Sequence, residues 1–283
     1  MTFRYLSALC LLWSAAWGLT GCGGGGDSSN AGSNGGTLTP SEPVAVPVRV
    51  EPGIYIGTQA TKEFVSVLSP NAVSDQWYGL HYASSNPSIE DPNIYSGQIK
   101  DIGSWTASIA NLRYFPINSS YSSVYAGNAV ITAPSSGQLK GDLNLAPTIQ
   151  MTTFSATPTK ALTFNQAANL RDIAGAWTGR LSYGAGTNGA FSFTVSALGE
   201  VATANFGVDC KWTAPHFQIS ADTAVNLFKL NVTLSQSTAC DFSEKTLTGV
   251  AFVMASPAPN KTQRLIWIAT TSTGQGMSFK ADR

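Results

Sequence analysis

Apolar and polar residues alternate in short runs through the second half of the chain. A period of two is typical of β-strands with one face in a core and the other in solvent. The pattern predicts strands at 191–197, 228–235, 250–255 and 277–281. Residues 265–269 are apolar at every position, which predicts a strand covered on both faces.

The first half shows the same alternation at 105–110 and 139–145. Turn signals rich in Pro, Gly, Asn or Ser separate the runs in both halves. Residues 163–174 favour a helix, which Asn165 could cap and Gly175 would end. We expect a first β domain at 53–160, a linker with a short helix at 161–174, and a second β domain at 175–283.

Two pentapeptides of the form Gly-x-aromatic-x-Gly open the two β-rich stretches. They are residues 53–57 and residues 175–179, and they suggest a duplication. Many short strands with little helix indicate an antiparallel β architecture, and closing each sheet removes its unpaired edges. We therefore predict a mainly β protein with two small antiparallel up-and-down β-barrels. The alternatives are β-sandwiches or one large β domain.

The chain begins with the layout of a secretory signal peptide. Arg4 supplies a positive start, and residues 5–20 form an uncharged run rich in Leu, Ala and Trp. The run is shorter than the ~20 residues that a membrane-spanning helix needs, and it suits the apolar region of a signal peptide. Residues 1–21 are therefore predicted to be removed on export. The alternatives are an ordinary signal peptide that happens to contain a Cys and an uncleaved membrane anchor.

The apolar run ends at Leu19-Thr20-Gly21-Cys22, which resembles the lipobox of bacterial lipoproteins, Leu-x-Gly/Ala-Cys. The resemblance implies that Cys22 carries a diacylglyceryl group, becomes the mature N-terminus and is then acylated on its amine. Several acyl chains form a firm anchor, because each buried CH₂ contributes ~0.8 kcal/mol. The residue after Cys22 is Gly23. In enteric-type sorting an Asp at this position favours retention in the inner membrane, so Gly23 favours the outer membrane. Its periplasmic and surface faces both remain open.

Residues 22–52 are predicted to be a tether. Residues 23–36 consist of Gly, Ser, Asn, Asp and Ala, which form a flexible coil, and four prolines then stiffen the chain toward polyproline II. The tether would hold the β domains clear of the lipid surface.

Charge is sparse and balanced, with 16 Lys+Arg against 16 Asp+Glu. Removal of residues 1–21 takes away Arg4, so the mature side chains carry 15 − 16 = −1 with His neutral. The composition therefore argues against a nucleic-acid partner and against a polybasic membrane patch.

The cysteine count predicts one disulfide. Cys10 leaves with the signal peptide and Cys22 takes lipid, so Cys210 and Cys240 remain as a pair in an oxidising compartment. The alternative is a two-thiol metal or redox site, although no Cys-x-x-Cys is present.

The lipobox, the poly-Gly tether and short barrels that open on Gly-x-aromatic-x-Gly resemble lipocalin-like barrels and transferrin-binding-protein-type surface lipoproteins in layout. The resemblance implies small closed barrels on a lipid tether. It assigns no binding residue.

Familiar catalytic motifs are missing from the sequence. There is no Gly-x-Ser-x-Gly elbow, Walker loop or His-Glu-x-x-His helix, and the two histidines are His81 and His216. Residues 184–189 fit Gly-x-Gly-x-x-Gly, but a strand rather than a helix follows, so we expect a hairpin loop. We predict no enzyme activity, no cofactor and no metal site. A hydrolase with a dispersed site, for example at His81 and Asp75, is an alternative.

Aromatic residues are concentrated in the first half, and they offer flat apolar faces with polar tips that suit sugar or peptide ligands. Barrel filling is the alternative role. Trp77 and Tyr78 are adjacent, so in a strand they face opposite sides. The candidate ligand-binding residues are Trp77, His81, Tyr95 and Trp105.

These observations favour a non-enzymatic binding module, lipid-anchored in the outer membrane, with an envelope, host or glycan ligand. A structural or assembly lipoprotein of an envelope machine is the first alternative, and the dispersed hydrolase is the second.

Overall fold

Eight consecutive strands form a closed barrel in the first β-rich stretch. The computed structural model describes residues 48–60, 62–69, 76–82, 93–116, 123–145, 149–160, 162–183, 187–204, 217–234 and 245–283. The strands of the first barrel are β1 (Gly53–Gln59), β2 (Lys62–Leu68), β3 (Gln76–Tyr82), β4 (Asn93–Lys100), β5 (Thr106–Pro116), β6 (Tyr125–Ser135), β7 (Gln138–Leu145) and β8 (Ile149–Pro158).

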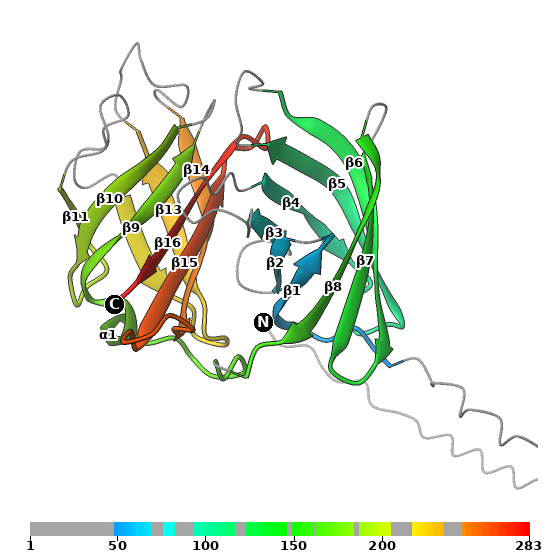
Figure 1. Cartoon of the computed structure of the whole chain (residues 1–283), viewed down its shortest axis with the longest axis horizontal. Helices are drawn as coiled ribbons and strands as arrows, with labels where there is room; N and C mark the ends of the chain where they lie inside the picture. Colours follow the sequence, from blue (N-terminus) through cyan, green and yellow to red (C-terminus); the bar gives the residue numbers. More distant parts are fainter. Residues whose placement is uncertain are drawn as a thin grey trace, which may run out of the picture. The chain divides into compact units, whose positions relative to one another are not determined.

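Each strand of the first barrel pairs antiparallel with its neighbour in sequence (Figure 1). The last strand, β8, returns to pair with β1, with Tyr55 opposite Pro158 and Gln59 opposite Phe154. This pairing closes the barrel, and the strand order is the up-and-down order that the sequence predicted.

Aromatic and aliphatic side chains fill the interior of the first barrel. In β7 the predicted alternation is confirmed, because Leu139, Gly141, Leu143 and Leu145 are buried, whereas the residues that alternate with them are exposed, namely Lys140, Asp142 and Asn144. Phe64 and Phe154 stack with their ring centroids 4.2 Å apart, and Trp77 lies beside both rings. The interior is therefore a packed core.

The second barrel has the same strand count. Its sheet runs in the order β11-β10-β9-β16-β15-β14-β13-β12, all antiparallel. The strands are β9 (Gly175–Tyr183), β10 (Thr187–Val195), β11 (Val201–Ala204), β12 (Phe217–Ala221), β13 (Phe228–Thr233), β14 (Thr246–Ala255), β15 (Gln263–Thr270) and β16 (Gly276–Asp282).

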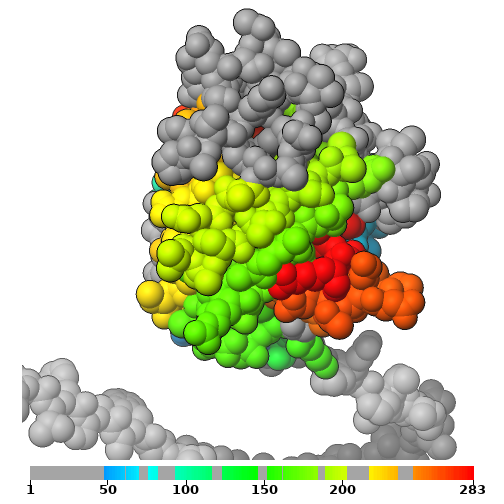
Figure 2. Space-filling model, turned by 90° about the vertical axis from the view of Figure 1, so that its left-hand side faces the viewer, coloured from blue at the N-terminus to red at the C-terminus, as the bar shows by residue number. Residues whose placement is uncertain are grey.

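A short seam joins the two ends of this second sheet. Glu200 forms an isolated bridge with Gln218, and the Ile219 N–H donates to the Gly199 carbonyl at 2.9 Å. Figure 2 shows the yellow-green and yellow strands of this region side by side at the surface. The fold is thus mainly β, with two eight-stranded antiparallel barrels, as predicted.

The repeated pentapeptides open both barrels and make the same close contact. A Cβ on Gly57 would lie 1.9 Å from the Ser155 carbonyl oxygen of β8, and a Cβ on Gly179 would lie 2.1 Å from the Lys280 carbonyl oxygen of β16. In each barrel, therefore, the close approach of the first and last strands at this position requires a glycine.

The aromatic residue of each pentapeptide donates a hydrogen bond to a backbone carbonyl four residues earlier in the chain. The Tyr55 hydroxyl donates to the Glu51 carbonyl at 2.8 Å, and Trp177 Nε1 donates to the Ile173 carbonyl at 2.7 Å. The Arg283 guanidinium lies over the Trp177 ring, with its Cζ 3.9 Å from the ring centroid. Both barrels therefore fix the segment that precedes their first strand in the same way.

The linker helix is shorter than the sequence suggested. Helix α1 (Leu170–Ile173) is a single turn, and its N-cap is Asn169, whose Oδ1 accepts from the Arg171 N–H at 3.0 Å. Asn165, the cap that the sequence suggested, lies before the helix begins. Ala174 is already extended, so the chain enters β9 directly.

Side chains on the outward faces of both barrels are also buried. Val65 and Val67 point away from the first barrel's core, and Ile266 and Ile268 point away from the second, yet all four are fully buried. They belong to one apolar cluster that also contains Phe252. This contact explains why residues 265–269 are apolar throughout, because one face packs inside its barrel and the other packs against the neighbouring barrel.

The last residues of the predicted tether contact the first barrel. The Val48 N–H donates to the Ala133 carbonyl at 3.2 Å, the Val50 N–H donates to the Ser104 carbonyl at 2.9 Å, and the Val50 side chain is fully buried. The chain is therefore held against the barrel before β1 begins. The predicted signal peptide, Cys22, the earlier tether and the Cys210–Cys240 pair lie outside the described residues, as does His216.

We expect Gly179→Ala to lower the free energy of unfolding by about 2–4 kcal/mol, because the new methyl group overlaps the β16 backbone. Gly189→Ala is the matched control, since a Cβ there meets nothing within 4 Å. Urea unfolding of the two variants measures the difference. Equal midpoints would contradict the close-approach argument.

We expect Ile266→Ala to cost about 3 kcal/mol, because its outward side chain is buried between the barrels. Val130 also points away from its barrel core but is 44% exposed, so Val130→Ala should cost less than ~0.5 kcal/mol. Chemical denaturation followed by tryptophan fluorescence tests this contrast. A cost for Ile266→Ala as small as that for Val130→Ala would mean that the interface contributes little.

Candidate functional site

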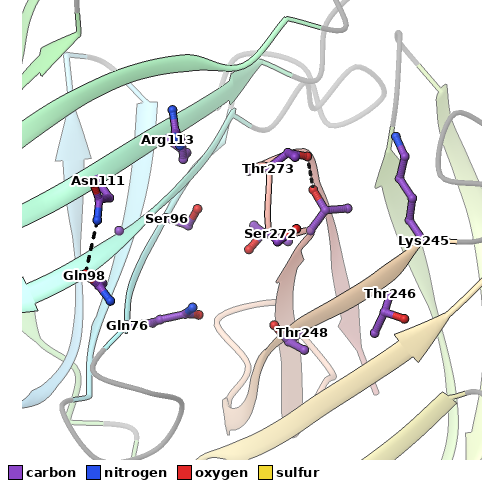
Figure 3. Close-up of a pocket in the computed structure, with 14 residues that line it drawn as sticks. Gln76, Ser96, Gln98, Asn111, Arg113, Lys245, Thr246, Thr248, Ser272 and Thr273 are labelled. Carbon is purple, nitrogen blue, oxygen red and sulfur yellow. Dashed lines mark hydrogen bonds between the residues drawn. The ribbon is translucent and has the colours of Figure 1, made fainter.

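A polar groove lies beside the contact between the barrels. Its volume is about 870 Å³, and one wall comes from β3, β4 and β5 of the first barrel. The other wall comes from the start of β14 and from the turn between β15 and β16 (Figure 3). The groove therefore exists only where the two barrels meet.

The lining is rich in side chains that can both donate and accept hydrogen bonds. Among the described residues the lining includes two cations and no carboxylate. The amide side chains are Gln76, Gln98 and Asn111; the hydroxyl side chains are Ser96, Thr246, Thr248, Thr270, Thr271, Ser272 and Thr273; the cations are Arg113 and Lys245; and Gly97 and Gly274 complete the lining.

The turn between β15 and β16 is held by its own hydrogen bonds. The Thr271 N–H donates to the Gln275 carbonyl at 2.8 Å, and the Gly274 N–H donates to the Thr271 carbonyl at 3.0 Å. Gly274 has a φ of 91°, and a Cβ there would lie 2.6 Å from Arg113 Cβ. Glycine thus lets the turn pack directly on the stem of Arg113.

A β-bulge in β5 places Asn111 in the groove. The register of β5 shifts between Ile109 and Leu112, and both of these residues are buried. Asn111 has a φ of 52°, a left-handed conformation that Asn tolerates better than most residues. Its Nδ2 donates to Gln98 Oε1 at 3.3 Å, and Figure 3 shows the two amides turned toward each other.

The two cations come from different walls. Figure 3 shows Arg113 on the β5 side and Lys245 on the β14 side, with the turn that carries Ser272 between them. Lys245 Nζ donates to Gln275 Oε1 at 2.6 Å. Arg113 is half-buried, and its guanidinium has no hydrogen-bond or ion-pair partner within the described part of the chain.

The residues that the sequence singled out lie elsewhere. Trp77 is fully buried in the first barrel, donating from Nε1 to Ser66 Oγ at 2.8 Å, and Tyr95 is buried near it with ring centroids 6.2 Å apart. Tyr78 faces the opposite side, in the inter-barrel cluster, as its adjacency to Trp77 predicted. Trp105 was expected on the apolar face of its strand but precedes β5 and is 54% exposed.

His81 joins a buried polar network at the end of the first barrel where β1 turns into β2. The Tyr95 hydroxyl donates to Gln59 Oε1 at 3.2 Å, and Asn93 Nδ2 lies 3.3 Å from His81 Nδ1. Burial, with a smaller effect of Lys62, lowers the His81 pKa to about 4, so the ring is neutral near pH 7. The network connects His81 with Tyr95 but leaves both away from the groove.

Tyr114 stacks on Tyr95 at the edge of this network, with ring centroids 4.9 Å apart. Burial raises the Tyr114 pKa to about 12 and also raises the Tyr95 pKa, so both phenols stay protonated at physiological pH. His81 Nε2 and Asn93 Oδ1 are buried and lack a partner among the described residues. These features indicate a packed structural network in which two buried polar atoms, His81 Nε2 and Asn93 Oδ1, make no hydrogen bond to the described residues.

Within the described ranges, no three His, Cys, Asp or Glu side chains gather in a metal-binding arrangement. The helical part of the described chain contains no segment long and apolar enough to cross a membrane.

The groove residues gave weak signals in the sequence. Residues 270–274 read Thr-Thr-Ser-Thr-Gly, which indicates a turn but not a ligand site. Asn111 interrupts the alternation that β5 otherwise follows, which was the available hint of a bulge. The pairing of the two walls depends on how the barrels pack, which local patterns do not report.

Comparisons with known proteins give little guidance. No protein-family model matches the chain, and no curated protein matches it. Among solved structures, the chain is distantly similar to a candidate outer membrane protein from Bacteroides fragilis NCTC 9343, at 11% identity over 85% of this chain and 98% of that chain. The TM-score is 0.23, which supports no conclusion about the function of this chain.

We expect His81→Gln to flatten the pH dependence of stability. The folded-state pKa of about 4 lies below the ordinary value of 6.5, so the unfolded chain takes up this proton first as pH falls. The contribution of neutral His81 is complete above pH 6.5 and is lost on the way down to pH 4. The wild-type protein should lose on the order of 2 kcal/mol through this group, measured by urea unfolding at several pH values. An unchanged slope in the variant would show that His81 does not titrate in this window.

Proposed function

We propose that this chain is a lipid-anchored binding module of the bacterial outer membrane, and that it holds its ligand in the inter-barrel groove without catalysing a reaction. The groove carries the proposal. Its volume of about 870 Å³ falls in the range of known ligand sites, roughly 300–1,000 Å³. Side chains from both barrels converge on it, and most of them can bond a ligand in either direction.

The packed interiors support a site on the outside of the barrels. Phe64, Phe154 and Trp77 occupy the centre of the first barrel, and Trp267, Phe279 and Phe193 pack together in the second. A ligand inside either barrel would have to displace these rings. The groove needs no such displacement.

The N-terminal segment supports the anchor. Leu19-Thr20-Gly21-Cys22 follows an apolar run, and a Gly-rich segment separates Cys22 from the first barrel. An anchored groove would meet ligands close to the membrane, where a high local concentration of the ligand allows even a weak site to be occupied.

We expect Cys22→Ala to abolish incorporation of radioactive palmitate in bacteria that express the full chain. Cys10→Ala is the matched control, because Cys10 lies in the segment that precedes the proposed cleavage. The control should keep both the label and the membrane fraction. Label that persists in Cys22→Ala would remove the anchor from the proposal.

Photo-crosslinking in intact cells tests the groove. A photoreactive residue in place of Ser272, which is exposed in the groove, should capture an envelope component, whereas one in place of the exposed Ala190 on β10 should not. Capture at neither position, or equal capture at both, would contradict a ligand site in the groove. Capture of an outer-membrane protein at Ser272 would instead favour the assembly role.

A further inference from the structure

The charge pattern of the groove narrows the class of its ligand. Arg113 and Lys245 line it, and no carboxylate of the described residues does. A groove to which the described residues contribute two cations and no anion favours a negatively charged ligand. Lys245 already donates to Gln275, so Arg113 is the cation with more donor capacity left.

Arg113 is held ready for such a ligand. The residue is half-buried, its guanidinium is without a hydrogen-bond or ion-pair partner in the described ranges, and Gly274 packs on its stem. A guanidinium in this position offers a planar pair of donors that match a carboxylate. Because the stem is already fixed, less side-chain entropy is lost on binding.

The remaining lining argues for a saccharide. Hydroxyl and amide side chains both donate and accept, and so do the hydroxyl groups of sugars. An acidic peptide would gain less from so many acceptors. No aromatic ring lies among the described lining residues, so a neutral sugar has no flat surface to stack on, and charge must supply the affinity instead.

Asn111 adds a second, independent observation. Its backbone is held at a φ of 52°, in a region that strains a residue with a side chain, and the bulge turns its amide toward Gln98 in the groove. Local strain of this kind is retained where the surrounding structure fixes it, and it clusters at ligand sites.

We infer that the groove binds an acidic oligosaccharide, with Arg113 pairing with a carboxylate and the Asn111–Gln98 amides bonding the neighbouring hydroxyls. This inference rests on the proposed binding function and names its ligand class. The ligand crosses the turn that carries Ser272, which places its far end near Lys245.

The full-length lipoprotein in detergent micelles, titrated calorimetrically, tests the inference. The acidic probes are trigalacturonate and 3′-sialyllactose, and their uncharged counterparts are galactotriose and lactose. At least one acidic probe should bind at least tenfold more tightly than its counterpart, and added salt should weaken that binding.

Arg113→Met keeps the stem that Gly274 packs on and removes the charge. It should weaken binding of the acidic probe at least tenfold and leave the thermal midpoint unchanged. Arg171→Met, an exposed arginine in α1, is the matched control and should bind as the wild type does.

Asn111→Gly separates recognition from structure. Glycine accepts positive φ, so the thermal midpoint should hold or rise, while affinity for the acidic probe should fall severalfold. A structural role for Asn111 would instead lower the midpoint and leave affinity intact.

Three outcomes would overturn the inference: no binding of either acidic probe at millimolar concentration, equal affinity for the uncharged counterparts, or equal competition by inorganic phosphate or triglutamate. Capture at Ser272 in cells together with any of these results would retain the binding function and reject its ligand class. Absence of capture would reject the function itself.

Discussion

The apolar contact between the outward faces of the two barrels is the constraint on which the candidate site depends. A solitary barrel in water would carry polar residues on the outside of each strand, yet Val65, Val67, Ile266 and Ile268 point outward and are buried. Burial of these side chains stabilises the contact between the barrels through the hydrophobic effect. This contact also sets the position of the groove walls, because Gly276 packs on Ile94 and Gly274 packs on Arg113 at the edge of the contact.

Both barrels are closed by one device that is used twice. A glycine in the opening strand admits the backbone of the closing strand, and an aromatic residue two positions earlier bonds to a carbonyl four residues before it. Tyr55 and Trp177 differ in their polar atom but serve the same purpose. The recurrence gives the pentapeptide repeat a structural meaning, because each residue type answers a steric or hydrogen-bonding need.

The strands and their barrel closure could be read from the sequence because period-two patterning and turn residues are local signals. The runs at 139–145 and 265–269 form β7 and β15. The sequence showed that β15 is apolar on both faces, but it did not show that the first barrel covers one of them. The helix was overestimated, since local propensity around Ala167 and Ala168 did not outweigh the chain's extended path there.

The groove could not be read in the same way. Asn111, Arg113 and Ser272 are unremarkable in sequence, and they line one groove only through a bulge, a glycine turn and the packing of two barrels. The sequence analysis instead predicted aromatic residues as the ligand-binding residues, because ligand sites and barrel cores use the same residue types. Trp77 and Tyr95 belong to the core, where their large side chains fill space.

The strap formed by Val48 and Val50 has a mechanical consequence. Any pull on the chain before residue 48 reaches the first barrel through the Val48–Ala133 and Val50–Ser104 hydrogen bonds before it reaches β1. The load is then shared by β6 and by the segment that joins β4 to β5, and the seam between β1 and β8 is shielded. A force applied to the chain before residue 48 would therefore leave the closing strands paired.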